Sequence, residues 1–217
     1  MMRMASLSAA ILLLCANAFA QVAPATGKAT PPAPPAAAAP PHDRHDGMSV
    51  SADPYTDPAR VKEKFGKANP LAVGILPIEV VMRNETSEPL RVDLRTVQLE
   101  FPVRGGRLQG IDWLAVGDVA IMIAHPKGTP APEARRFPIA KPVPQTDSKT
   151  MKMAEMLQPM ALDTDLVPPN GMIHGFLFFE VGHDLSFLAN ASLYVPDVVS
   201  MQSKKPLIFF EVPLGQR

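Results

Sequence analysis

Hydrophobic and polar residues alternate from residue 75 onward with the two-residue period of a β-strand. Leu76, Ile78, Val80 and Met82 fall on one side of this predicted strand. Because successive side chains of an extended chain point to opposite faces, the alternation predicts a strand with one buried face. Pro77 interrupts it. Since proline donates no backbone hydrogen bond, we expect a sheet edge, a strand start or a bulge there.

A second alternating segment follows the polar turn at residues 84–89 and changes phase partway. The apolar positions of residues 90–94 are even-numbered, and those of residues 97–101 are odd-numbered. A one-residue shift moves the apolar side chains to the other face of a straight strand, so we expect a β-bulge or a tight corner. The sequence Arg-Gly-Gly-Arg at residues 104–107 then predicts a hairpin turn.

The C-terminal third of the chain returns to strand patterns after a turn signal, Pro-Pro-Asn-Gly, at residues 168–171. Residues 175–181 are almost all apolar, which is typical of a central strand covered on both faces. Shorter strands are predicted at residues 191–195 and 207–214. Short strands in antiparallel order with long connections predict a mainly β fold, an antiparallel sandwich.

One to three short helices are predicted among these strands. Asp57 followed by proline has the order of an N-cap and a first-turn proline, and Gly66 ends this helix. The second helix is predicted at residues 116–123, where a strand is the less favoured alternative, and the third at residues 149–158. We interpret the second and third helices as an insertion in the sandwich at residues 111–165.

The first 20 residues carry the pattern of a cleavable secretory signal. Arg3 supplies a positive charge, residues 9–14 form a short apolar run, and Ala-Phe-Ala at residues 18–20 is a small-x-small cleavage site. The apolar run is too short to span a bilayer. We therefore expect a periplasmic or secreted protein with no transmembrane segment in the mature chain.

Cys15 is the only cysteine of the chain and lies inside the predicted signal. The residues before it resemble a lipoprotein box, but lipid attachment favours a small residue where Leu14 stands. A soluble exported form is therefore favoured over a lipoprotein anchored through Cys15. Cleavage after Ala20 leaves a mature chain that offers no disulfide, thiolate metal site or cysteine nucleophile.

Residues 21–52 are predicted to form a disordered tether before a single domain at residues 53–217. Proline and alanine dominate the stretch up to residue 47, where aromatic and large aliphatic residues are nearly absent. Such a segment buries too little apolar surface to offset the entropy of ordering. The His/Asp cluster at residues 42–46 is interpreted as a polar linker end, in preference to a weak transition-metal site.

Charge and motifs argue against several classes of function. Lysine plus arginine and aspartate plus glutamate number 21 each, so the chain is not built to coat nucleic acid or an anionic membrane. The motifs of serine hydrolases, zincins, phosphate-binding loops and dinucleotide-binding turns are absent. His183, Asp184 and Ser186 are interpreted as turn residues, because sequence neighbours rarely converge as a triad. We expect no enzymatic activity and no cofactor.

Two blocks of the β pattern carry a family resemblance. Residues 76–84, Leu-Pro-Ile-Glu-Val-Val-Met-Arg-Asn, lead through a polar turn to Glu-Pro-Leu at residues 88–90, and residues 168–171 precede the apolar run at residues 175–181. These blocks resemble the immunoglobulin-like domains of unknown function in bacterial exported proteins and lipoproteins, where a strand ends in an asparagine that bonds to the backbone. The resemblance covers less than half of the domain and implies an immunoglobulin-like sandwich without an active site.

Four closely spaced methionines offer a second hypothesis. Thioether sulfurs suit Cu(I), so Met151, Met153, Met156 and Met160 suggest a periplasmic copper-handling protein. On a helix, the last three share one face, which is also the ordinary core-facing stripe of an amphipathic helix, and we favour that interpretation. The preferred function is a non-enzymatic binding module for an unknown protein or envelope component, with the proline-rich loop at residues 125–148 as its first candidate surface.

Overall fold

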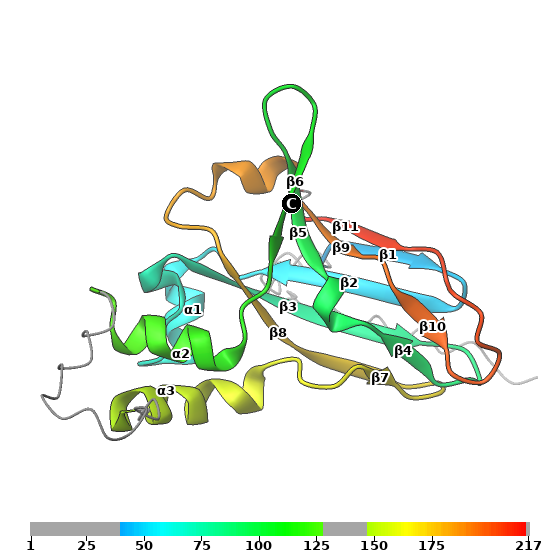
Figure 1. The fold of residues 1–217 in the computed structure, drawn as a ribbon, viewed down its shortest axis with the longest axis horizontal. Coiled ribbons are helices and arrows are strands. Elements are labelled where there is room, and N and C mark those ends of the chain that lie inside the picture. Colours follow the sequence, from blue (N-terminus) through cyan, green and yellow to red (C-terminus); the bar gives the residue numbers. More distant parts are fainter. Residues whose placement is uncertain (1–39, 128–146, 216–217) are drawn as a thin grey trace, which may run out of the picture. The chain divides into compact units, whose positions relative to one another are not determined.

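The computed structural model describes residues 40–127 and 147–215. This part of the chain is mainly β, as the sequence predicted, and it has three antiparallel sheets and three short α-helices (Figure 1). No helix among the described residues is both long and apolar enough to traverse a bilayer. The predicted signal at residues 1–20, most of the predicted tether and most of the loop at residues 125–148 lie outside the described residues.

The first sheet, here called the β3 sheet, has the strand order β1-β2-β3-β8. All of its neighbouring strands pair antiparallel. Its central strand is the long alternating segment predicted at residue 75 onward. The four strands are β1 (His42–His45), β2 (Met48–Pro54), β3 (Ile75–Asn84) and β8 (Met172–Glu180).

β1 and β2 correct the predicted boundary between tether and domain. Met48 and Val50 are fully buried, and β2 pairs along its whole length with β3. Asp46 and Gly47 have positive φ angles of 49° and 76° and form the two-residue turn between β1 and β2. The prediction of a disordered tether is therefore wrong for residues 42–52. The His/Asp cluster is a strand with its turn, and not a linker end.

Two further sheets complete the β structure. The β4 sheet has the order β10-β4-β7, and the β5 sheet has the order β11-β9-β5-β6. Of these strands, β7 and β10 were not predicted, and β11 is shorter than the predicted strand at residues 207–214. The strands are β4 (Leu90–Val92), β5 (Gln98–Pro102), β6 (Leu108–Asp112), β7 (Leu166–Val167), β9 (Ser192–Val195), β10 (Val198–Ser200) and β11 (Phe210–Pro213).

A shared corner connects the β4 sheet to the β5 sheet. The chain passes from β4 to β5 through the single-turn helix η2 (Leu94–Thr96), and from β9 to β10 through residues 196–197. The two connections meet, because the Asp93 N–H donates to the Asp197 carbonyl at 2.9 Å. The phase change predicted as a bulge or a corner is this corner, where η2 reorients the chain between two strand pairs.

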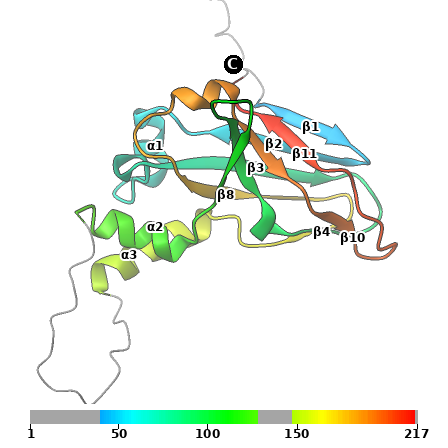
Figure 2. The ribbon, with the colours of Figure 1, turned by 45° about the horizontal axis from the view of Figure 1, so that its top comes forward.

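The three α-helices lie where the sequence placed them. They are α1 (Pro58–Phe65), α2 (Val116–Ala124) and α3 (Ser148–Leu157), and Figures 1 and 2 show them gathered at one end of the β3 sheet. The Asp57 side chain caps α1 by accepting from the Ala59 N–H at 2.9 Å, as the N-cap prediction requires. The remaining single turns are η1 (Leu71–Val73), η3 (Gln158–Met160) and η4 (Ser186–Asn190).

Two hydrophobic clusters hold this part of the chain together. The larger cluster takes buried side chains from all three sheets, such as Leu76, Val92 and Leu193. The smaller cluster packs the helices on the outer face of the β3 sheet, where the rings of Phe65 and Phe176 meet edge to face at 4.9 Å. The large cluster accounts for the two-residue alternation, and the small one for the apolar faces of the helices.

The apolar run at residues 175–181 forms most of β8, but its position differs from the prediction. The strand is buried on both faces over residues 175–179, as predicted, yet it is the last strand of the β3 sheet and not a central one. Its outer edge is covered by single bridges from Trp113 and Ala161. Backbone from outside the sheet therefore buries this strand, which apolar composition alone does not distinguish from a central position.

Pro77 lies where the ladder between β2 and β3 ends. Its carbonyl accepts from the Tyr55 N–H at 3.0 Å, just beyond the last residue of β2. In an antiparallel strand the nitrogen and carbonyl of one residue point to the same side. The missing donor of Pro77 therefore faces the end of β2, and the predicted edge-like setting is confirmed.

Candidate functional site

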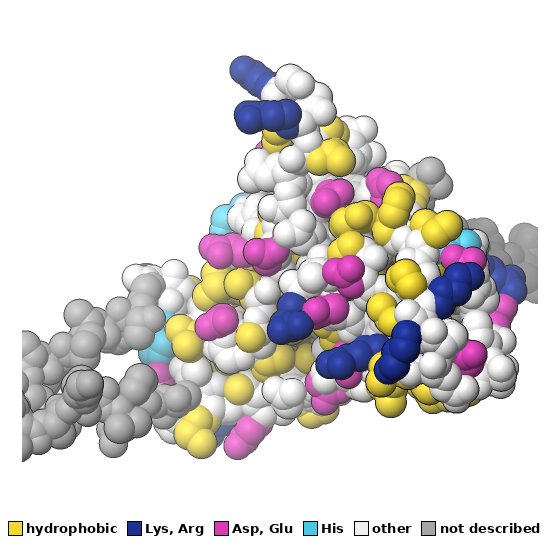
Figure 3. Space-filling model, turned by 45° about the vertical axis from the view of Figure 1, so that its right-hand side comes forward, with side chains coloured by type: hydrophobic (Ala, Val, Ile, Leu, Met, Phe, Trp, Pro, Cys, Tyr) yellow, Lys and Arg dark blue, Asp and Glu magenta, His cyan; other side chains and the backbone are white. Residues whose placement is uncertain are grey.

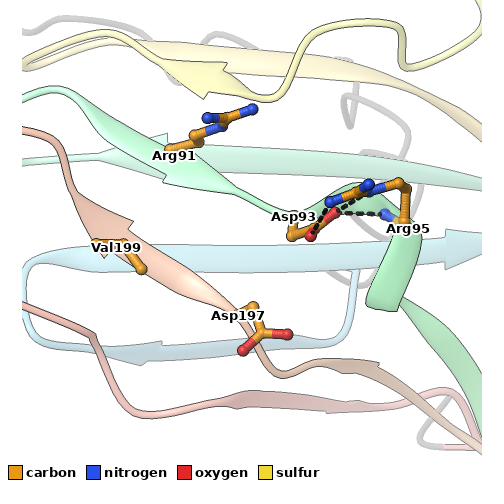
Figure 4. A pocket seen from close by; sticks show the side chains of 5 residues that line it. All are labelled: Arg91, Asp93, Arg95, Asp197 and Val199. Atoms are coloured by element: carbon orange, nitrogen blue, oxygen red, sulfur yellow. Dashed lines mark hydrogen bonds and ion pairs between the residues drawn. The ribbon is translucent and has the colours of Figure 1, made fainter.

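A surface pocket of about 280 Å³ opens at the corner between the β4 sheet and the β5 sheet. Figure 4 shows that its side chains come from two chain segments, β4 with η2 on one side and β10 with its preceding turn on the other. The corner therefore brings together residues about a hundred positions apart in sequence. The lining residues are Arg91, Asp93, Arg95, Asp197 and Val199.

The alternation along β4 explains why charged side chains line this pocket. Leu90, Val92 and Leu94 point into the large hydrophobic cluster. The intervening residues, Arg91 and Asp93, must then point outward, since successive side chains in a strand alternate between faces. Because η2 bends the chain directly afterward, the outward-facing side chains surround a hollow and do not extend along a flat sheet.

Arg95 and Asp93 form a two-point ion pair at the edge of the pocket. The Arg95 Nε donates to Asp93 Oδ1 at 2.9 Å, and Nη2 donates to Oδ2 at 2.7 Å. These side-chain hydrogen bonds, helped by the Arg95 backbone N–H, hold the pKa of the Asp93 carboxyl below its usual range. The pair is exposed to solvent, so it orients the guanidinium more than it stabilises the fold.

The other two charged groups of the pocket differ in their bonding. The Arg91 Nε donates to Asp165 Oδ2 at 2.8 Å, and the Arg91 side chain is 61% exposed. Within the described part of the chain, the Asp197 carboxylate takes part in no hydrogen bond or ion pair. The pocket thus presents cationic donors and a carboxylate acceptor side by side, which suits binding of a dipolar or mixed-charge group.

An exposed apolar strip continues from the pocket. The Leu207 N–H donates to the Val198 carbonyl at 2.8 Å, so the next residue, Ile208, lies beside Asp197. Ile208 and Phe209 are 61% and 47% exposed, and the Phe209 ring contacts the Tyr194 ring at 5.5 Å. Figure 3 shows hydrophobic side chains beside Lys and Arg on this side of the molecule. We call the following residues the corner face: Arg91, Asp93, Arg95, Tyr194, Asp197, Val199, Ile208 and Phe209.

The four methionines of the copper hypothesis do not share one environment. Met151 and Met156 are exposed, whereas Met153 and Met160 pack against the small hydrophobic cluster around Leu157. The predicted common face of Met153, Met156 and Met160 is therefore divided between solvent and core. Copper binding stays a prediction.

The histidine-containing segments considered as candidate sites make contacts that hold a turn and a strand in place. The Asp184 Oδ1 accepts from the Ser186 N–H at 2.9 Å, which ties the turn, and this backbone bond lowers the pKa of the Asp184 carboxyl. His45 stacks on the Phe210 ring at 3.9 Å and contacts the Phe209 carbonyl through Nε2 at 2.9 Å. Among the described residues, no group of three or more His, Cys, Asp or Glu side chains is arranged to hold a metal ion.

The loop predicted as the first candidate surface lies for the most part outside the described residues. Its two ends are joined, because His125 Nε2 contacts Asp147 Oδ2 at 2.5 Å. Asp147 also caps α3, accepting from the backbone N–H groups of Lys149 and Thr150 at 2.8 and 2.9 Å. These bonds, the one from the Thr150 backbone foremost, hold the pKa of the Asp147 carboxyl far below its usual range.

The sequence signal for the corner face was present but ambiguous. Ile208 and Phe209 were included in a strand predicted at residues 207–214, where alternation would bury one of any two neighbours. β11 begins only at Phe210, so both preceding side chains remain outside the core. The outward positions of Arg91 and Arg95 were readable from the alternation, but their convergence with Asp197 depends on the corner.

Comparison with known proteins adds no identification. No family model matches the chain, and neither a curated protein nor a solved structure matches it.

Proposed function

We propose that the chain is an exported, non-enzymatic binding module whose corner face contacts a partner protein or another component of the cell envelope. The observation that carries this proposal is the exposure of Ile208 and Phe209 directly beside the pocket of Arg91, Arg95 and Asp197. Large apolar side chains that are exposed together beside polar groups mark interaction surfaces, because covering them with a partner removes apolar surface from water.

The composition of the corner face supports a protein partner. Aromatic residues and arginine are the residue types that contribute most to protein interfaces, and this face combines Tyr194 and Phe209 with two arginines. The ion pair between Arg95 and Asp93 holds one guanidinium in place before binding. A partner that presents an apolar anchor next to a mixed-charge group fits this arrangement.

The proposed setting is the periplasm or the exterior of the cell, reached through a signal at residues 1–20. The positive charge, the short apolar run and the small-x-small cleavage site of that segment support export. The proposed form is soluble and not anchored through Cys15. The proposed fold type is an immunoglobulin-like sandwich. Its support is the antiparallel pairing around the larger hydrophobic cluster and the side chain of Asn84, which bonds to backbone at the end of β3 as the resemblance implies.

A pull-down from envelope extracts tests the corner face. The bait proteins are the wild type, an Ile208→Ser/Phe209→Ser variant and an Arg91→Ala/Arg95→Ala variant. We expect each variant to lose most of the partner recovered by the wild type. Met151→Ser, which alters an exposed apolar residue on α3, is the matched control and should retain the partner.

The same experiment separates the corner face from the loop. A variant lacking residues 128–146 should retain the partner if the corner face is the contact surface. Equal recovery by the wild type and both corner variants would contradict the proposal, and loss only in the loop variant would transfer the function to that segment.

A further inference from the structure

The hairpin of β5 and β6 projects from the rest of its sheet, as Figures 1 and 2 show. Its two strands pair antiparallel from Gln98 with Asp112 to Pro102 with Leu108. The turn is closed by the Val103 N–H, which donates to the Arg107 carbonyl at 2.8 Å. β6 is the last strand of the β5 sheet, so its second edge has no neighbouring strand among the described residues.

The positions of the hydrogen-bonded pairs along this hairpin show which backbone groups face that open edge. Bonded and non-bonded pairs alternate along an antiparallel ladder. Since Arg107 is bonded to β5, the N–H and C=O groups of Leu108 and Gly110 point away from β5. In the described part of the chain these groups have no hydrogen-bond partner. Farther along the same edge, the Leu114 N–H donates to the Phe178 carbonyl at 2.7 Å, so β8 occupies the edge only beyond the end of β6.

The open segment of β6 lacks three of the features by which edge strands avoid pairing. Proline, lysine and bulges protect exposed edges in native sheets, but β6 reads Leu-Gln-Gly-Ile-Asp. The Leu108 side chain is 66% exposed. Gly110 carries no side chain, and a Cβ there would lie 2.6 Å from Gln98 Oε1. This glycine therefore makes room for the Gln98 side chain of β5, and it leaves the backbone groups of its own residue without a side chain beside them.

Charge is distributed unequally along the hairpin. Arg104 and Arg107 stand at its tip, where Figure 3 shows dark-blue side chains, and within the described residues neither one meets a carboxylate. Glu100 and Asp112 lie toward its base. Burial, and after it the nearby Glu211, raises the pKa of the Glu100 carboxyl. Acidic residues of a segment that lies along the edge are therefore attracted at the tip of the hairpin and repelled at its base.

We propose that the open edge of β6 accepts an extended segment of a partner polypeptide as an additional strand. The segment bonds to the backbone of Leu108 and Gly110, covers the Leu108 side chain with an apolar residue and places acidic residues beside Arg104 and Arg107. Main-chain bonding supplies affinity in such strand addition, and the charged tip fixes the direction of the added strand. This site is separate from the corner face and does not depend on it.

The test uses the full chain and a capped six-residue probe peptide, two aspartates followed by alternating valine and threonine. A peptide with lysines in place of the aspartates is the charge control. Backbone amide exchange, followed residue by residue by NMR, is the readout. At saturating acidic peptide we expect exchange at Leu108 and Gly110 to slow by about tenfold or more. Exchange at Gln109 and Ile111, which face β5, should not change.

Paired variants identify the groups responsible. Leu108→Pro removes the outward N–H together with the leucine side chain and should abolish peptide binding, whereas Leu108→Ala removes the side chain alone, keeps that donor and should weaken binding less. Arg104→Glu/Arg107→Glu tests the site independently of the proline variant, which could misfold. This charge variant should abolish binding of the acidic peptide. Ile208→Ser/Phe209→Ser should bind the peptide as the wild type does, so failure of the corner-face proposal and failure of this one are distinguishable.

Three results would overturn the proposal. One is unchanged exchange at Leu108 and Gly110 with the acidic peptide, and another is equal protection by the lysine peptide. The third is slowed exchange that depends on protein concentration without any peptide, because this would assign the edge to a second copy of the chain.

Discussion

Asn84 and Pro168 are 84 positions apart in the chain, and the Asn84 side-chain amide donates to the Pro168 carbonyl at 3.1 Å. The same amide nitrogen also contacts the Glu88 carbonyl at 2.8 Å, while Asn84 Oδ1 accepts from the Thr86 N–H at 2.9 Å. One buried side chain thereby fastens the turn after β3 to the turn before β8.

Replacing Asn84 by alanine should therefore destabilise the domain strongly. The residue is 1% exposed, so its loss leaves buried backbone carbonyls and the Thr86 N–H without partners. We expect the free energy of unfolding to fall by about 3 kcal/mol, measured by urea denaturation. Asn190→Ala alters an exposed asparagine at the end of η4 and should change it by less than about 0.5 kcal/mol. Equal effects of the two substitutions would contradict the role of Asn84.

Lys204 is a site where substitution should stabilise the domain. Its φ angle is +55°, in the left-handed region that a lysine side chain disfavours. Lys204→Gly should raise the free energy of unfolding by about 0.5–1 kcal/mol, because glycine adopts this conformation without the steric penalty. Lys205→Gly, at the next position, is the control and should not stabilise. A thermal melt of the three proteins decides between these outcomes.

The pattern of apolar positions predicted the elements better than it predicted their neighbours. The alternation along β3 and the caps of α1 depend on residues close together in sequence, and both were predicted. The position of β8 at a sheet edge depends on Trp113 and Ala161, which cover it from distant segments. A local pattern reports whether a strand is buried and carries no information on what buries it.

The missed hairpin at β1 and β2 shows a different error. The dipeptide Asp46-Gly47 is a strong signal for a two-residue hairpin turn, and Met48, Val50 and Ala52 alternate after it. The tether predicted at residues 21–52 rests on the proline-rich composition before this turn and ignores the turn signal. The corner face was unpredictable for a further reason, since its pocket exists only where η2 and residues 196–197 meet.

Phe176 should be the most sensitive aromatic position of the small hydrophobic cluster. Its ring meets Tyr55 at 5.0 Å and Phe65 at 4.9 Å, both edge to face. Phe176→Ala should lower the free energy of unfolding by about 4 kcal/mol, because it removes buried contacts and leaves a cavity. Phe209→Ala removes a half-exposed ring and should cost about 1 kcal/mol or less. Denaturant midpoints for the two variants measure this difference, and a Phe209 variant that unfolds would contradict its place on the corner face.

The bonds of Asp147 predict a specific acid dependence of stability. Its folded-state pKa lies below the unfolded value of about 3.9. The stabilisation from its carboxylate is therefore complete above that unfolded value and is lost as the pH falls through the folded pKa. Asp147→Ala should lower the melting temperature at pH 7, and the difference from the wild type should shrink progressively below about pH 4. Asp163→Ala removes an exposed carboxylate that has no hydrogen bond in the described part of the chain, and it should show no comparable change. A wild-type advantage over Asp147→Ala that grows as the pH falls below about 4 would mean that the carboxylate does not hold α3 and His125 as the structure places them.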